Sequence, residues 1–150
     1  MDVLHNYRND SRCNRYQRYE DTSREYLQKF VQDYGSCTFL SKEEEQHYAI
    51  VCSANGEMMG DMSVFFTEKD GCFTLGITIA SHFQHQGYAY ELLKEVVVRI
   101  QKAYPSVDIV ALIEKENKKS IQLFRKLNFT QERYAESIKS YVFVIYGKAE

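Results

Sequence analysis

A short segment in the middle of the chain, Gln84-His85-Gln86-Gly87-Tyr88-Ala89, combines small residues with side chains that donate hydrogen bonds. Gly87 has no Cβ and Ala89 has only a methyl group, so an anion can reach backbone N–H groups that larger side chains would cover. The segment opens a predicted helix, whose first N–H groups lack partners within the helix and whose dipole is positive at this end. We therefore expect this segment to bind a pyrophosphate.

The elements on either side of this segment support that placement. A strand-like alternation ends at Ile79, and Pro105 marks the end of the helix that follows. The buried face of that helix is predicted from apolar residues spaced three and four apart, namely Ala89, Leu92, Leu93, Val96, Val97 and Ile100. A ligand at its start meets the backbone of Gln86 to Ala89, and Gln84 can add an amide donor. A glycine turn before a helix is also a common plain connection, so this segment alone does not decide the function.

A second strand-and-helix unit follows the first. Ile109 to Ile113 reads as an apolar strand, and Asn117 after it is a typical residue to cap a helix. A short apolar stripe then leads to Asn128, which can end the helix in a left-handed conformation before the aromatic Phe129. Two such units in succession favour an α/β fold.

Together the two units resemble the GNAT superfamily of acyl-coenzyme A dependent N-acetyltransferases. The coenzyme motif of that family is Gln or Arg, two residues, Gly, one residue, then Gly or Ala, and it is met by Gln84, Gly87 and Ala89. The later family pattern is met by Asn117, Ser120, Lys126, Leu127 and Phe129, with Asn128 in place of the usual Gly. The run Gly87 to Glu91, with Met59-Gly60-Asp61 earlier, is most similar to the branch of ribosomal-protein N-terminal alanine acetyltransferases.

The resemblance implies that an amine attacks the thioester of acetyl-coenzyme A (acetyl-CoA) directly, in a ternary complex. It implies that the pantetheine arm adds to the splayed edge of a strand at Leu75 to Ile79, where a backbone N–H near Ile77 polarises the thioester carbonyl. The expected coenzyme-binding residues are Ile77, Ile79, Gln84, Gln86, Gly87, Tyr88, Ala89, Asn117 and Ser120. The acceptor that the resemblance implies is a protein N-terminal α-amine or a small primary amine. An α-amine, with a pKa of about 7.7–8.0 against about 10.4 for lysine, needs only a weak base and is favoured.

The departing thiolate needs a proton donor. Many GNAT enzymes use a tyrosine at the position where this chain has Phe124, so that acid is missing here. The expected catalytic residues are Ser120, or Asn117 through a water that it holds, although both also suit the capping of a helix. Asp61, Glu114 and Glu116 are candidate bases that the sequence does not rank.

Two other functions stay open at this point. Phe124 and a short N-terminus are compatible with a non-catalytic acyl-CoA-binding module. The series Arg8, Arg12, Arg15 and Arg18, interleaved with tyrosines, is compatible with an RNA-binding surface. Nearby acidic residues dilute that basic run, so a solvated helix face or a rim for an acidic substrate is the preferred interpretation, and nucleic acid is disfavoured as a partner.

Composition is consistent with one globular domain over residues 1–150. Of 150 residues, 44% are hydrophobic and 27% charged, and the net charge is −2. No stretch approaches the roughly 20 apolar residues that span a membrane, and the polar start lacks a signal-peptide core, so a cytoplasmic protein without membrane contact is expected. The cysteines Cys13, Cys37, Cys52 and Cys72 form no Cys-x-x-Cys pair, and His82 and His85 lack further ligands, so no metal site is expected.

The predicted fold is α/β, with a single mixed central sheet and flanking helices. Helices are predicted at 3–16 and 23–34, with an apolar stripe of Tyr26, Leu27, Phe30 and Val31 on the second. Antiparallel strands follow at 47–53, 58–66 and 72–79, joined by turns at Asn55-Gly56 and Lys69-Asp70-Gly71, and further strands at 107–113, 129–134 and 141–146. Segments 8–21 and 132–140 are the expected substrate loops. The family's first strand is short or missing here, which would leave an open edge near His47 and favour a homodimer.

Overall fold

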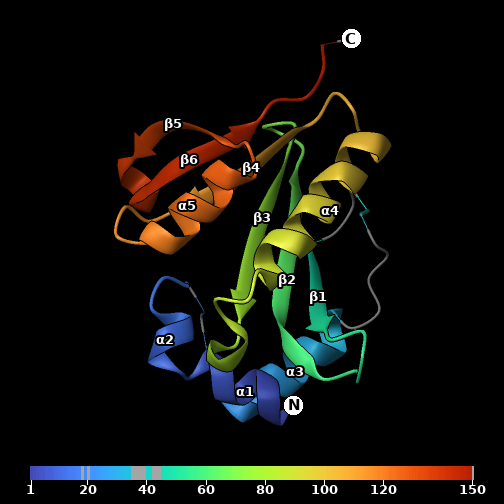
Figure 1. The fold of residues 1–150 in the computed structure, drawn as a ribbon, viewed down its shortest axis with the longest axis vertical. Coiled ribbons are helices and arrows are strands. Elements are labelled where there is room, and N and C mark those ends of the chain that lie inside the picture. Colours follow the sequence, from blue (N-terminus) through green and yellow to red (C-terminus); the bar gives the residue numbers. More distant parts are fainter. Residues whose placement is uncertain (18, 20, 35–39, 42–44, 150) are drawn as a thin grey trace.

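Six strands form one mixed sheet in the computed structural model of the protein, which describes all residues except 18, 20, 35–39, 42–44 and 150 (Figure 1). The predictions made for Arg18 and Cys37 therefore lie outside the described residues. The strands are β1 (Gln46–Val51), β2 (Met58–Thr67), β3 (Cys72–Ile79), β4 (Asp108–Ile113), β5 (Thr130–Ala135) and β6 (Ser140–Ile145). Their order in the sheet is β1-β2-β3-β4-β6-β5, and β3 and β4 form its parallel pair.

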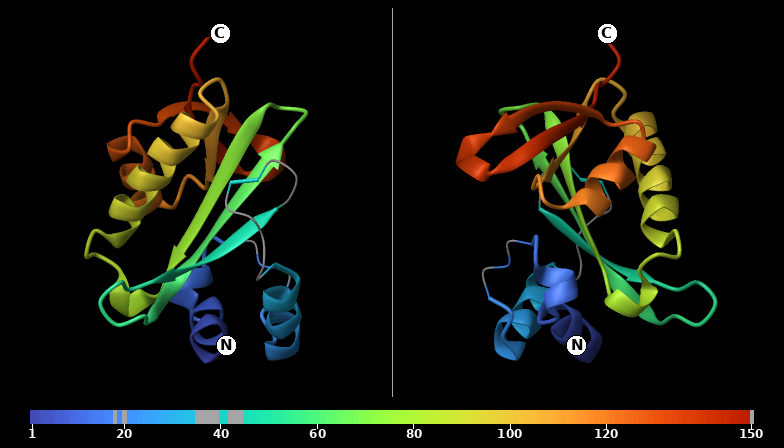
Figure 2. Two further views of the ribbon diagram at one scale, coloured as in Figure 1. Left: turned by 90° about the vertical axis from the view of Figure 1, so that its right-hand side faces the viewer. Right: turned by 60° about the vertical axis from the view of Figure 1, so that its left-hand side comes forward.

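The helices cover both faces of this sheet. They are α1 (Asp2–Arg8), α2 (Ser11–Asn14), α3 (Arg24–Tyr34), α4 (Tyr88–Ala103) and α5 (Lys118–Lys126). Figures 1 and 2 show α4 and α5 on one face, with α1 and α3 across from them. The main core lies between the sheet, α4 and α5, and a smaller core lies under α1 and α3 around Leu4, Tyr7 and Leu27. None of the helices described is long and apolar enough to cross a membrane.

The α/β fold with one mixed sheet is confirmed, and several of its local signals act as expected. Gly56 has φ 71° in the β1–β2 turn, where the Glu57 N–H donates to the Asn55 side chain over 2.9 Å. Asn128 adopts φ 69° at the end of α5. The predicted stripe on α4 is buried at Leu93, Val96, Val97 and Ile100.

Two predictions near the N-terminus are wrong. The single helix expected over 3–16 is broken, because the Asp10 side chain accepts the Arg12 N–H over 2.9 Å and caps a new turn, α2. On α3 the apolar stripe is narrower than predicted, since Leu27 is fully buried whereas Val31 is 45% exposed. The outer strand β1 pairs with β2. A homodimer through its other edge stays a prediction.

The sheet opens between β3 and β4. Their parallel pairing joins Cys72, Phe73 and Thr74 to the segment 108–110, and beyond Thr74 the two strands no longer pair. The rest of β3, from Leu75 to Ile79, therefore has an unpaired edge on the β4 side. This opening positions the candidate site.

Candidate functional site

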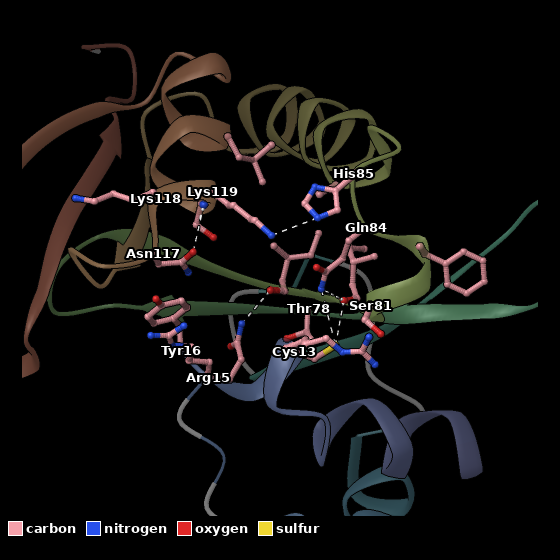
Figure 3. Close-up of a pocket in the computed structure, with 18 of the residues that line it drawn as sticks. Cys13, Arg15, Tyr16, Thr78, Ser81, Gln84, His85, Asn117, Lys118 and Lys119 are labelled. Atoms are coloured by element: carbon pink, nitrogen blue, oxygen red, sulfur yellow. Dashed lines mark hydrogen bonds between the residues drawn. The ribbon is translucent and has the colours of Figure 1, made fainter.

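A groove of about 1150 Å³ lies at this opening, bordered by the start of α4, the start of α5 and the α2 region (Figure 3). It brings together most of the predicted site residues, namely Ile77, Ile79, Gln84, Gly87, Tyr88, Ala89, Asn117 and Ser120. Gln86 does not line it, and its exposed amide donates to the His82 carbonyl over 3.1 Å. The size suits a ligand of cofactor class.

The start of α4 faces the groove with free backbone donors. Gly87 precedes the helix with φ 83°, in the left-handed conformation that favours glycine, and a Cβ built there meets nothing within 4 Å. Gly87 brings no side-chain acceptor, so the first N–H groups of this 16-residue helix have no side-chain cap from that residue. The helix dipole adds positive potential at the same place. This arrangement can bind an anion.

The charged side chains around the groove strengthen that preference. Among the described residues that line it, one is acidic, Glu116, while the lysines and arginines are Arg12, Arg15, Lys118, Lys119 and Lys126. Lys119 Nζ lies 3.2 Å from His85 Nε2, close to the start of α4. Figure 3 shows these two side chains across the groove from Arg15 and Tyr16. The groove therefore attracts negatively charged ligands.

The unpaired edge of β3 presents backbone groups to the groove. The Thr78 carbonyl faces β2, since it would lie 2.0 Å from a Cβ built on Gly60. Neighbouring residues of an extended strand point their backbone groups to opposite edges, and the N–H and C=O of one residue point to the same edge. The N–H groups of Ile77 and Ile79 therefore face the groove together with their carbonyls.

Both of these carbonyls already have partners. The Gln84 amide donates to the Ile79 carbonyl over 2.8 Å, and the Gln17 amide donates to the Ile77 carbonyl over 3.2 Å. Gln84 was expected to offer its amide to a pyrophosphate, but in the structure this group anchors the loop between β3 and α4. The donors left for a ligand along this edge are the strand N–H groups.

Asn117 and Ser120 sit at the start of α5. The Asn117 side chain accepts the Ser120 N–H over 3.3 Å, which is the capping role that the sequence indicates. Phe124 is 3% exposed and packs edge-to-face on Phe129, with ring centroids 5.0 Å apart. It carries no ionisable group, so Ser120 is the hydroxyl that α5 presents to the groove.

The three candidate bases differ in whether they line the groove. Asp61 does not line the groove, because its carboxylate accepts hydrogen bonds from Tyr7 and Arg8 on α1. Glu114 also lies outside the lining, whereas Glu116 is part of it. The interpretation of Arg8 as part of a solvated arginine face is wrong, since Arg8 is 4% exposed, and the proposed RNA surface loses one of its four members.

Burial changes the acidity of the groups beneath the groove. It raises the pKa of Tyr7 far above its usual value, with the Asp61 charge adding to the effect. Burial likewise raises the pKa of Tyr19 to about 12, and it raises the pKa of the Cys13 thiol in the groove wall. A raised pKa disfavours the thiolate form of Cys13, which is the reactive form of a cysteine. The described residues contain no group of three or more His, Cys, Asp or Glu placed to hold a metal ion.

Sequence reasoning missed the side chains that reach the groove from the N-terminal segment. Tyr16 donates to the Glu116 carbonyl over 3.2 Å, and Tyr19 and Thr78 share a hydrogen bond of 2.7 Å. These partners are 59 to 100 residues apart in the chain. The sequence predicts a substrate loop at 8–21, which contains both tyrosines. No pattern of residue spacing in the sequence distinguishes Gln17 from its neighbours.

Comparisons with known proteins agree with this geometry. The sequence model of the acetyltransferase (GNAT) domain matches residues 1–130. A GNAT-family acetyltransferase from Bacillus anthracis aligns with a TM-score of 0.76 and 16% identity, over 97% of this chain and 87% of that chain. No curated protein sequence matches the chain significantly.

Two further solved structures are of acetyltransferases that are named for different substrates. Ribosomal-protein-S5-alanine acetyltransferase from Vibrio fischeri aligns with a TM-score of 0.70 and 14% identity, over 97% of this chain and 86% of that chain. A chimera of the spermidine N-acetyltransferase SpeG from Vibrio cholerae and hSSAT aligns with a TM-score of 0.67 and 16% identity, over 97% of this chain and 89% of that chain. At this low sequence identity, the similarity to these structures shows a shared fold and does not show a shared substrate.

Proposed function

Because the chain belongs to the GNAT acetyltransferase family and is an N-acetyltransferase, we propose that its groove binds acetyl-CoA and presents the thioester to a primary amine. The observation that carries this proposal is the open start of α4 at Gly87, which faces a groove rich in lysine and arginine. Acetyl-CoA has the matching chemistry, since it joins a pyrophosphate to a long arm with two amide groups.

The proposed position of the coenzyme follows the groove from end to end. The N–H groups from Gln86 to Ala89 bind the pyrophosphate, and Lys119, which donates to His85 Nε2, adds positive charge beside it. The pantetheine arm runs along the unpaired edge of β3 and accepts from its N–H groups. The Ile77 N–H donates to the thioester carbonyl and stabilises the negative charge that develops there during attack.

The reaction needs one bond to form and one to break. The lone pair of a neutral amine attacks the thioester carbon, the C–N bond forms, and the C–S bond breaks as the thiolate leaves. The nitrogen gives up a proton, for which Glu116 is the candidate carboxylate that lines the groove. The thiolate gains a proton from Ser120 or from a water bound to Asn117, and the proton that Glu116 took from the amine replaces it through solvent, so the products are the amide and free coenzyme A.

The charges that line the groove favour some acceptor amines over others. A polyamine is a polycation, and it would meet five lysine and arginine side chains against one glutamate among the described lining residues. The α-amine of a peptide carries at most one positive charge and loses it near neutral pH. We therefore propose a protein or peptide N-terminus as the acceptor in preference to a polyamine.

Release of free thiol from acetyl-CoA tests this function. The protein is mixed with acetyl-CoA and, separately, with peptides that begin with Ala, Ser or Gly, with spermidine and with an aminoglycoside. We expect thiol release with at least one α-amine peptide and little with spermidine. Faster turnover of spermidine than of every peptide would contradict the proposed acceptor. Binding of acetyl-CoA without thiol release from any amine would favour a non-catalytic coenzyme-binding module.

A further inference from the structure

Three side chains from the segment after α2 bridge the two lips of the groove. We name Tyr16, Gln17 and Tyr19 the bridge. Tyr16 bonds the Glu116 carbonyl on the β4–α5 side, whereas Gln17 and Tyr19 bond Ile77 and Thr78 on β3. The bridge therefore spans the opening between β3 and β4 at the level of Ile77.

Residues on α1 and β2 support the bridge at Tyr19. The Arg8 guanidinium lies 4.4 Å from the centre of the Tyr19 ring, and the Asp61 carboxylate binds Arg8 in turn. Tyr19 is also bonded to the Thr78 hydroxyl over 2.7 Å, and its burial is reflected in a pKa raised to about 12. These contacts fix the place from which Gln17 reaches the groove.

Gln17 is the member of the bridge with an unused acceptor at the site. Its Nε2 donates to the Ile77 carbonyl over 3.2 Å, which holds the carboxamide against β3. Its Oε1 receives no hydrogen bond from any residue that the structure describes, and Gln17 lines the groove. The N–H of the same Ile77 is the group proposed to hold the thioester carbonyl, so the proposed coenzyme position brings the reacting carbon to the residue that the Gln17 carboxamide contacts.

We propose that Gln17 orients the acceptor amine, its Oε1 accepting one N–H of the incoming nitrogen. This inference rests on the proposed function. A neutral amine that donates one N–H keeps its lone pair available, and the fixed carboxamide directs that lone pair toward the thioester carbon. Since a carboxamide does not titrate, Gln17 supplies orientation and takes no proton.

Kinetics of Gln17→Met test this role, because methionine keeps the length of the side chain and removes both polar atoms. Gln101→Met on the exposed end of α4 is the matched control. The probes are acetyl-CoA and the peptide of the panel that turns over fastest. We expect kcat/KM for the peptide to fall about 10- to 100-fold in Gln17→Met. Thermal stabilisation by acetyl-CoA and the midpoint of the pH–rate profile should stay unchanged, and Gln101→Met should match the native protein throughout.

Several results would overturn the inference. An unchanged kcat/KM would show that the amine does not use Gln17. Tighter binding of acetyl-CoA by Gln17→Met would show that the carboxamide competes with the pantetheine arm for β3, and loss of acetyl-CoA binding would show a structural role. If the native protein binds acetyl-CoA but acetylates none of the panel, the orienting role fails. Failure of the native protein to bind acetyl-CoA would instead refute the proposed function.

Discussion

Arg8 on α1 and Asp61 on β2 form an ion pair with 3.3 Å between Nη2 and Oδ2, although 53 residues separate them in the chain. Their side chains are 5% and 13% exposed. Tyr7 donates to the same carboxylate, and the Arg8 guanidinium also lies over the rings of Tyr19 and Phe30. This cluster fastens the N-terminal segment to the sheet directly behind the groove.

Removing the carboxylate should destabilise the protein strongly. Asp61→Ala leaves the Arg8 charge buried without its partner, and we expect a loss of about 3–5 kcal/mol in the free energy of unfolding, measured with urea. Asp2→Ala is the control, since Asp2 pairs with Arg24 in an exposed position and its loss should have little effect. Equal effects of the two substitutions would contradict a buried, stabilising pair.

The raised pKa of Tyr19 predicts a loss of stability at alkaline pH. Its pKa is about 12 in the folded protein against 10.0 for an ordinary tyrosine, so the unfolded chain ionises first as pH rises. The contribution of Tyr19 is fully present below pH 10 and is lost between about pH 10 and 12. The free energy of unfolding should therefore fall less steeply over this range in Tyr19→Phe than in the native protein. Identical slopes would argue against this assignment.

Local signals in the sequence were sufficient to predict most of the fold. The Asn55-Gly56 turn, the spacing on α4 and the Asn117 cap each depend on neighbouring residues, and each appears in the structure. The resemblance to the GNAT family, drawn from two short motifs, is confirmed. The helix over 3–16 failed for an equally local reason, because Asp10 can either continue a helix or cap a new turn, and pattern alone does not separate the two.

The site was harder to predict, because its polar contacts join distant segments. Asp61 is a candidate base by its residue type, and only the fold shows that its carboxylate forms an ion pair with Arg8. Gln84 lines the groove, but its hydrogen bond to Ile79 depends on how the loop folds back. Contacts of this kind leave no spacing pattern in the sequence.

Loss of the Ser120 hydroxyl should slow the chemical step. If Ser120 protonates the departing thiolate, Ser120→Ala should lower kcat about 100-fold while leaving the KM for acetyl-CoA nearly unchanged. Ser106→Ala, in the loop before β4, is the control. A full rate in Ser120→Ala would assign the proton to a water held by Asn117 instead.

Lys119 should contribute to coenzyme affinity through its charge. Lys119 is exposed, so Lys119→Ala should raise the dissociation constant of acetyl-CoA only about 2- to 5-fold at low salt. The difference from the native protein should shrink between about 0.05 M and about 0.5 M salt, because screening weakens exposed charges. Calorimetric titration measures both values. Lys102→Ala, at the far end of α4, should bind as the native protein does. An effect of Lys119→Ala that persists at high salt would contradict a purely electrostatic role.

Thermal unfolding with and without acetyl-CoA tests the central claim most directly, in the native protein and in Gly87→Glu and Gly71→Glu. The two substitutions introduce the same charge. Both glycines have positive φ, and a Cβ built on either meets nothing within 4 Å, so the backbone strain is comparable. Ligand at 100 times its dissociation constant should add about 2.7 kcal/mol to the stability of the native protein. We predict the same gain in Gly71→Glu and none in Gly87→Glu, whose carboxylate repels the pyrophosphate at the start of α4. No gain in the folded native protein, or an equal gain in all three, would contradict the proposed coenzyme site.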